Sequence, residues 1–169
     1  IHGPQGIGQW QLSLTLAQAW LCDAAAGARR PCGRCASCRL VQAHSHPDLL
    51  VLLPEALQGP LGWTIGDTDA EAPETGSKTR QPSKEIKVEA VRAAVAFAQT
   101  TPAREAGKVV VLHPAERMNG ISANALLKTL EEPAGTVLFM LGSSAPGSLL
   151  PTIRSRCQAL RLDLPPRAE

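Results

Sequence analysis

Apolar residues are arranged along the chain in two alternating patterns. One is a continuous apolar run, which is typical of a strand buried on both faces of a sheet. The other repeats every three to four residues, as on the buried side of a helix. The runs predict strands at 49–53, 109–112 and 137–141, and the periodic segments predict helices at 9–21, 88–98 and 122–130. Because helices and strands alternate, we expect an α/β fold of three layers, with a parallel sheet covered on both faces.

The first predicted helix has a recognisable apolar face, which we expect to be buried. Leu12, Leu16 and Trp20 recur at four-residue spacing along it. The residues that widen this face are Ala17, Ala19 and Leu21.

The last part of the chain predicts a short helical segment that ends over 153–157, followed by a final strand. Leu160, Leu162 and Leu164 alternate with other residues before Pro165, as in a strand with one buried face. We assign residues 1–164 to one domain and residues 165–169 to the start of a linker.

Residues 54–83 interrupt both patterns. This segment is rich in Pro and Gly and carries an acidic patch, at Asp67, Asp69, Glu71 and Glu74. A structureless stretch of such length is uncommon inside a compact domain. We interpret it as a surface insertion that is either simply tolerated or faces a partner, and the tolerance of proteins for surface loops favours the first alternative.

The composition narrows the class of protein. The 169 residues are 44% hydrophobic and 19% charged, with a formal net charge of +2. This chain is apolar enough to bury a core, and it has no apolar run long enough to span a bilayer. A net charge so close to zero gives no general signal for nucleic-acid binding. The chain opens on Ile1-His2-Gly3 without a signal segment, so we expect a cytoplasmic protein with reduced thiols, beginning at the tail of a strand.

Four of the five cysteines lie close together in the sequence, at Cys22, Cys32, Cys35 and Cys38. Four thiolates satisfy a tetrahedral Zn²⁺ and leave no open position, which is typical of a structural site rather than a catalytic one. In a reducing compartment, such a cluster binds metal more often than it forms disulfides. We therefore predict a structural zinc site within residues 22–38, and we do not count the distant Cys157 as a ligand.

Other interpretations of the cluster stay open. The cysteines could be free buried thiols or a redox pair, and arginines around them allow a nucleic-acid-binding zinc knuckle. These arginines are Arg29, Arg30, Arg34 and Arg39. No aromatic residues are interleaved with them to stack on bases, which weakens the nucleic-acid interpretation. His44 and His46 could replace a ligand, although His46-Pro47-Asp48 more simply leads into the first strand.

The turn before the first helix has the spacing of a phosphate-binding loop, G-x-x-x-x-G-K-[ST], up to its last two positions. In a working loop the Lys contacts the phosphates and the hydroxyl ligates Mg²⁺. In this chain those two positions hold Gln9, which is neutral, and Trp10, which has no hydroxyl. Spacing alone allows an equally good alternative, a simple glycine turn that Gly3, Gly6 and Gly8 form between a strand and a helix.

The residues after the predicted strand at 109–112 also depart from those of a nucleotide hydrolase. A nucleotide hydrolase of this type would carry Asp and Glu after this strand, to hold Mg²⁺ and polarise water. The chain has His113-Pro114 there instead, and no residue nearby in the sequence would make His113 a catalytic base. Loss at both places indicates a nucleotidase scaffold that is retained for another purpose.

The sequence SANALLKTLEEP at 122–133, followed by Ser155-Arg156-Cys157, resembles the clamp-loader branch of the AAA+ proteins. With the cysteine cluster and the degenerate loop added, the chain is similar to the delta-prime subunits of bacterial DNA polymerase III. The resemblance covers nearly the whole chain and is weakest over 54–83. The ATP-hydrolysing gamma/tau subunits share the same motif, but they keep the Lys and the Asp-Glu pair that this chain lacks.

The resemblance implies a non-hydrolysing member of a ring-like loader that binds ATP between subunits. It implies that Arg156 is a trans arginine finger at a neighbouring gamma/tau ATP site, where a guanidinium can donate to two phosphate oxygens at once. The implied direct partners are the gamma/tau and delta subunits, with the sliding clamp and primer-template DNA contacted through the assembly. It further implies a zinc-binding insertion, and a helical lid and collar for which 169 residues leave no room, so we expect the first domain of a longer protein.

Alternatives to this function remain. Arg156 could be an ordinary surface or ion-paired arginine beside Arg154. The chain could also be an ATP-hydrolysing gamma/tau-like subunit with an atypical loop, which Gln9 and Trp10 argue against, or a stand-alone zinc-knuckle protein that binds nucleic acid. We expect no intrinsic ATPase activity, in a subunit of a DNA-directed DNA polymerase holoenzyme.

Overall fold

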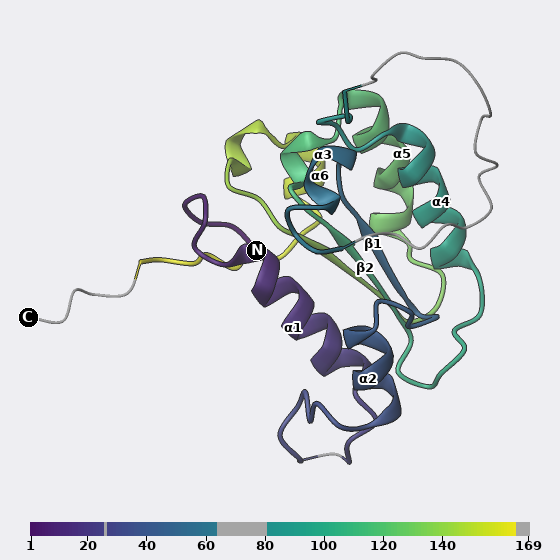
Figure 1. The fold of residues 1–169 in the computed structure, drawn as a ribbon. Coiled ribbons are helices and arrows are strands. Elements are labelled where there is room, and N and C mark those ends of the chain that lie inside the picture. Colours follow the sequence, from purple (N-terminus) through teal and green to yellow (C-terminus); the bar gives the residue numbers. More distant parts are fainter. Residues whose placement is uncertain (26, 64–80, 165–169) are drawn as a thin grey trace, which may run out of the picture.

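Three parallel strands form the sheet at the centre of the chain (Figure 1). The structure is a computed structural model that describes residues 1–25, 27–63 and 81–164. The strands are β1 (Leu49–Leu52), β2 (Lys108–Leu112) and β3 (Val137–Leu141), in the order β1-β2-β3. Val110 of β2 lies opposite Leu50 of β1 and Phe139 of β3. All three predicted strands are therefore confirmed, to within one residue at each end.

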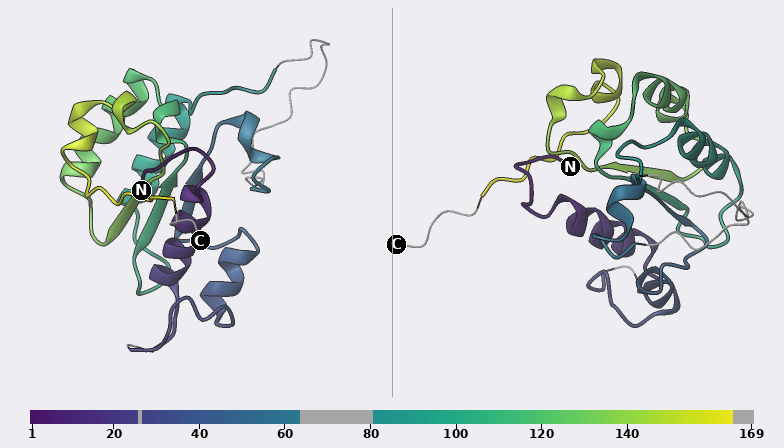
Figure 2. Two further views of the ribbon diagram at one scale, coloured as in Figure 1. Left: turned by 90° about the vertical axis from the view of Figure 1, so that its left-hand side faces the viewer. Right: turned by 45° about the horizontal axis from the view of Figure 1, so that its top comes forward.

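Helices cover both faces of this sheet, as the alternating pattern predicts. α1 (Gln9–Leu21) packs on β2 and β3 from one side. On the other side, α4 (Val88–Gln99) packs on β1 and β2, and α5 (Gly120–Glu131) packs against α4. The side view in Figure 2 shows the sheet between these two layers. The shorter helices are α2 (Ala36–Gln42), α3 (Glu55–Gln58) and α6 (Pro151–Arg154), and single 3₁₀ turns occur at Ala115–Arg117 and Pro146–Ser148.

The core lies on both sides of β2, whose side chains are all buried. Val109 and Val111 point to the α1 layer, where they join Trp10 and other apolar residues. Val110 and Leu112 point to the α4–α5 layer. Full burial of a Val or Leu side chain stabilises a fold by about 1.5–3 kcal/mol, so the sheet is fixed chiefly through this one strand.

A buried carboxylate fastens the start of the sheet to the loop before β2. Asp48 is only 1% exposed, directly before β1. Its two oxygens accept hydrogen bonds from the backbone N–H groups of Ala103 (2.7 Å) and Arg104 (2.9 Å). His46 is buried beside it, and its Nδ1 accepts the N–H of Asp48. The segment 46–48 is thus a structural lead into the strand, as expected.

The buried face of α1 differs from the prediction. Leu16 and Trp20 are 37% and 43% exposed, whereas the helix buries Gln9, Trp10, Ser13, Ala17 and Leu21. Small and hydrogen-bonded side chains let α1 approach the sheet closely. Ser13, for example, donates its hydroxyl to the backbone oxygen of Gln9. Ala17 and Leu21 are buried as predicted, so the regular spacing of the large apolar residues placed the buried face of a correctly predicted helix only partly correctly.

The prediction of a strand at the end of the chain is also corrected. Residues 160–164 form no strand, and only Arg161 makes a single bridge, to His2. Leu160 and Leu164 are exposed at 47% and 71%. The pairing is confined to His2, which donates its N–H to the backbone oxygen of Leu160 at 2.8 Å and accepts the N–H of Leu162 at 2.7 Å, because the chain turns away at Gly3 into the glycine loop. The helical segment predicted to end over 153–157 ends at Arg154 as α6.

The predicted insertion at 54–83 lies partly in the described chain. Residues 55–58 form α3, and Trp63 is buried. Residues 64–80 lie outside the described residues, as does the predicted linker at 165–169. No helix among the described residues is long and apolar enough to cross a bilayer.

Candidate functional site

The four clustered cysteines come together at one end of α1. The sulfur atoms of Cys22, Cys32, Cys35 and Cys38 all lie within 4.8 Å of one another. Two of the separations are 3.8 Å, between Cys22 and Cys35, and 4.0 Å, between Cys32 and Cys38. Tetrahedral zinc with Zn–S bonds of about 2.3 Å requires sulfur atoms about 3.8 Å apart. The four side chains therefore form a closed set that could hold a metal ion.

Local backbone structure directs these sulfurs toward one another. Cys22 is the residue at which α1 ends, and Cys35 is the N-cap of α2. The Cys35 sulfur accepts the N–H of Cys38, and the Cys32 sulfur accepts the N–H of Cys35, both at 3.4 Å. A Cys-x-x-Cys spacing thus places one ligand before the helix and the next in its first turn, where free N–H groups stabilise negative sulfur.

The four thiols differ in their tendency to ionise. Hydrogen bonds from the backbone N–H groups of Arg34 and Cys35 lower the pKa of Cys32 to about 6. Burial raises the pKa of Cys38 to about 12. Thiolates are the metal-binding form of cysteine. A bound divalent cation would stabilise the buried thiolate that burial disfavours, so the donor set fits a metal such as Zn²⁺.

A second layer of polar contacts closes the cysteine segment onto the domain. Asp23, next to Cys22, accepts the hydroxyl (2.7 Å) and the backbone N–H (3.1 Å) of Ser37, next to Cys38. These bonds lower the pKa of Asp23 below its usual value. Arg104 also contacts Asp23, at 3.4 Å. Asp23 thereby joins the two ends of the cysteine segment and connects them to the loop that Asp48 holds.

The remaining metal candidates lie elsewhere. His44 stacks on the ring of Trp63 at a centroid distance of 3.9 Å, and His46 is engaged with Asp48. Neither belongs to the ligand group that the described residues bring together. Cys157 lies apart and half-buried, and burial raises its pKa.

The glycine loop at the start of α1 is closed by its own sequence. Gln9 stands where a working loop has Lys, and it is 4% exposed. Its side-chain amide donates to the backbone oxygens of Gly3 and Pro4, both at 2.8 Å. Gly6 and Gly8 have φ of 82° and 106°, which favours glycine. The loop backbone is therefore bonded to a neutral amide at the position where Lys would meet a phosphate.

Aromatic side chains pack around Trp10, which follows this loop in the first turn of α1. Trp10 contacts Trp63 edge to face at 5.9 Å and lies 5.6 Å from the ring of His113. Burial lowers the pKa of His113, against the opposing charge of Glu116, so its imidazole is neutral at pH 7. The two positions at which the sequence departs from a nucleotide hydrolase thus meet in one packed cluster. Trp63 was not predicted as a core residue, since its only signal in the sequence is a large aromatic residue inside a Pro- and Gly-rich segment.

Arg156 lies on the surface, in the turn after α6. Its Nε donates to Oε1 of Glu131 at 2.6 Å, Nη2 contacts the same oxygen, and Nη1 donates to the backbone oxygen of Thr152 at 2.8 Å. The neighbouring Arg154 is also exposed. Arg156 is therefore exposed and ion-paired within its own chain. This is the state that the alternative to an arginine finger supposed.

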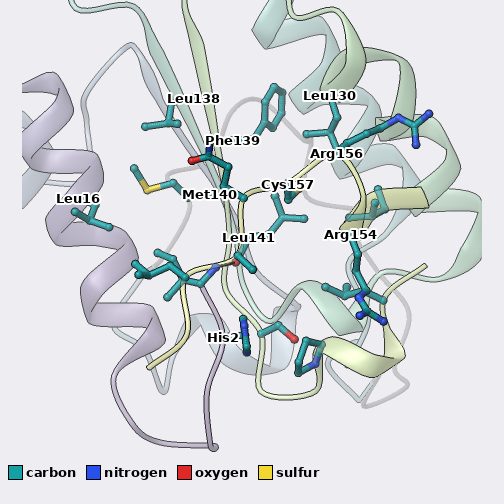
Figure 3. A pocket seen from close by; sticks show the side chains of 18 of the residues that line it. His2, Leu16, Leu130, Leu138, Phe139, Met140, Leu141, Arg154, Arg156 and Cys157 are labelled. Atoms are coloured by element: carbon teal, nitrogen blue, oxygen red, sulfur yellow. Dashed lines mark hydrogen bonds between the residues drawn. The ribbon is translucent and has the colours of Figure 1, made fainter. Parts of the chain in front are cut away.

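An apolar groove of about 1600 Å³ runs beside β3. Leu16 from α1, Met140 from β3 and Leu130 from α5 contribute to it, and the guanidinium of Arg156 points away from it (Figure 3). At one end, His2 bridges in parallel to Ser143 and to Arg161. His2 therefore lies between these two segments as a residue at the end of a strand would, directly before the glycine turn. The groove explains why Leu16 and Trp20 are exposed on this side of α1.

Comparison with known proteins gives a consistent set of relatives. The family model for the DNA polymerase III delta subunit matches residues 1–166. The chain is 42% identical over 167 residues to DNA polymerase III subunit delta' of Pseudomonas aeruginosa, and 37% identical over 165 residues to that of Haemophilus influenzae. Each comparison covers 98% of this chain and 42% of the relative.

A second kind of relative is more distant. The chain is 31% identical over 160 residues to DNA polymerase III subunit tau of Salmonella typhimurium, with 95% of this chain and 20% of that relative covered. The chain spans about two fifths of the length of the delta' relatives.

The aromatic cluster predicts unequal roles for two tryptophans. Trp63→Ala removes a buried side chain that contacts Trp10 and His44, and we expect the free energy of unfolding to fall by about 3 kcal/mol. Trp20→Ala is the matched control, since Trp20 is 43% exposed, and should cost about 1 kcal/mol or less. Urea unfolding measures both values. Equal losses would contradict the assignment of Trp63 to the core.

Proposed function

The chain belongs to the DNA polymerase III delta subunit family, and from this premise we propose that it is the nucleotide-inert AAA+-type domain of a delta-prime clamp-loader subunit in DNA replication. The closed glycine loop carries the proposal. Gln9 donates to the backbone oxygens of Gly3 and Pro4, and the next residue, Trp10, packs against Trp63 and His113. A scaffold without its cation and its Mg²⁺ ligands no longer stabilises the charge of phosphoryl transfer.

In this proposal the subunit assists ATP hydrolysis at a neighbouring site. Arg156 is the trans arginine finger for a gamma/tau subunit, since its guanidinium is exposed on the surface. A planar guanidinium donates to two phosphate oxygens and stays charged, so it compensates the charge that develops on the γ-phosphate. The direct partners are the gamma/tau and delta subunits, and contact with the sliding clamp and primer-template DNA comes through the assembly.

The cysteine cluster serves this function structurally. We assign Zn²⁺ to Cys22, Cys32, Cys35 and Cys38, because four closely spaced sulfurs and a closed ligand set fit that ion. When bound, the ion cross-links the end of α1 to the start of α2 and supplies no open coordination position. Asp23 and Ser37 then hold the cross-linked segment against the loop that contains Arg104.

The proposed function predicts that the chain does not bind nucleotide. Titration of the chain with ATP and Mg²⁺ in a calorimeter should give no saturable heat up to about 1 mM ATP, a ceiling that excludes binding tighter than about 4 kcal/mol. The reason is that the loop is bonded to Gln9 and lacks Lys. A gamma/tau subunit is the positive control. Saturable binding in the micromolar range would support the alternative of an active ATPase with an atypical loop.

Metal content tests the zinc assignment. We expect about one zinc ion per chain by elemental analysis, and much less in Cys32→Ser, which removes one of four ligands at a half-exposed position. Chelation should also lower the melting temperature of the wild-type chain by about 5–10 °C.

Cys157→Ser is the matched control for this experiment, because it removes a thiol that lies apart from the cluster. It should bind as much zinc as the wild-type chain. Unchanged zinc in Cys32→Ser would show that the four sulfurs are not the ligands.

The arginine finger is tested in the assembled loader. Arg156→Ala in the full-length subunit should lower turnover at the gamma/tau site that receives it by about 10³-fold, because a trans finger stabilises only the transition state. Arg154→Ala, an exposed arginine two residues away, should leave the rate near that of the wild type. If Arg156→Ala hydrolyses ATP at the wild-type rate in a correctly assembled complex, the finger assignment is wrong.

A further inference from the structure

Arg156 is bound on two sides by groups of its own chain. Its guanidinium carries five N–H donors, on Nε and on two terminal nitrogens. Nε and one N–H of Nη2 go to a single oxygen of Glu131, and one N–H of Nη1 goes to the backbone oxygen of Thr152. One N–H on each terminal nitrogen remains, and of these Nη1 makes only a longer contact of 3.3 Å with the hydroxyl of Ser155.

We propose that Glu131 is a positioning residue for Arg156, a role that rests on the proposed function of Arg156 as an arginine finger. Glu131 binds the side edge of the guanidinium, and its terminal edge is left to donate to two phosphate oxygens. The contact with Ser155 is long, and that exposed hydroxyl also donates to the backbone oxygen of Thr152 at 3.2 Å, so it is a weak competitor for a phosphate oxygen. The carboxylate thus fixes the direction of the finger and does not compete for the donors that the phosphate needs.

The framework that holds this pair is rigid. Glu131 is the last residue of α5, and Arg156 follows α6. The two helices pack together, and Ile153 of α6 is 1% exposed in the same core cluster as Leu126 of α5. A cation at the C-terminus of α5 also meets the negative end of that helix dipole. Buried contacts therefore set the distance between the carboxylate and the guanidinium, although both groups are at the surface.

Positioning matters because a free arginine side chain samples many rotamers. Immobilising such a side chain in the transition state costs rotamer entropy, which lowers the rate by about three- to tenfold, and a finger that is already held avoids this loss. The side chains of Arg156 and Glu131 are 32% and 45% exposed. The contact therefore orders a surface group that faces a partner, and it adds little to the stability of the isolated domain.

The test compares variants of Glu131 in the full-length subunit, assembled with its partner subunits. Glu131→Ala should lower kcat for ATP about three- to tenfold with KM unchanged, as expected when a group acts only in the transition state. Glu131→Gln should restore most of the rate, because both hydrogen bonds go to one oxygen, Oε1, which the amide retains. Glu132→Ala is the matched control, at the next position on the surface, and should match the wild type.

The outcomes separate this inference from the function on which it rests. A wild-type rate for Glu131→Ala, while Arg156→Ala is impaired, overturns the positioning role alone. A wild-type rate for Arg156→Ala overturns the arginine finger itself. If Glu131→Gln is as slow as Glu131→Ala although both melt at the wild-type temperature, the hydrogen bonds from Arg156 to Oε1 are not what sustains the rate.

Discussion

The burial of β2 on both faces is the constraint on which the rest of the structure depends. A central parallel strand made of Val and Leu has to be covered from both sides, and α1 and the α4–α5 pair provide the two covers. This arrangement brings His113, which follows β2, against Trp10 at the start of α1. The same helix ends at Cys22, so one element connects the closed glycine loop to the cysteine cluster. Packing around one strand thus places both features.

The sequence predicts the sheet better than it predicts the faces of the helices. Continuous apolar runs need burial on both sides wherever they occur, so β2 and β3 were predicted almost to the residue. The buried face of α1 was predicted only in part, at Ala17 and Leu21. Gln9 and Ser13 can be buried in α1 because backbone oxygens accept their hydrogen bonds. The spacing of apolar residues contains no information about such bonds, so it does not predict that these polar residues are buried. Leu16 and Trp20 border the groove beside β3 instead.

In the candidate site, too, features set by nearby residues were predicted, and contacts between residues far apart in the sequence were not. The four clustered cysteines were predicted from their spacing, since helix ends a few residues away set the positions of their sulfurs. The contacts of Trp63 with Trp10 and of Glu131 with Arg156 were not predicted, because the two residues of each pair lie far apart along the chain. Periodicity reports burial of a segment as a whole, whereas these two contacts depend on how separate segments meet in space.

The closed glycine loop makes two neighbouring positions depend on different parts of the molecule. Gln9 is held by the backbone oxygens of Gly3 and Pro4, whereas Trp10, the next residue, packs against Trp63 and His113. Replacing Gln9 with Lys would restore a cation and leave the aromatic cluster unchanged. Replacing Trp10 with Ser or Thr would supply a hydroxyl and leave a cavity beside Trp63 and His113. A phosphate-binding sequence at these two positions would therefore require compensating changes in residues that lie far from the loop in the sequence.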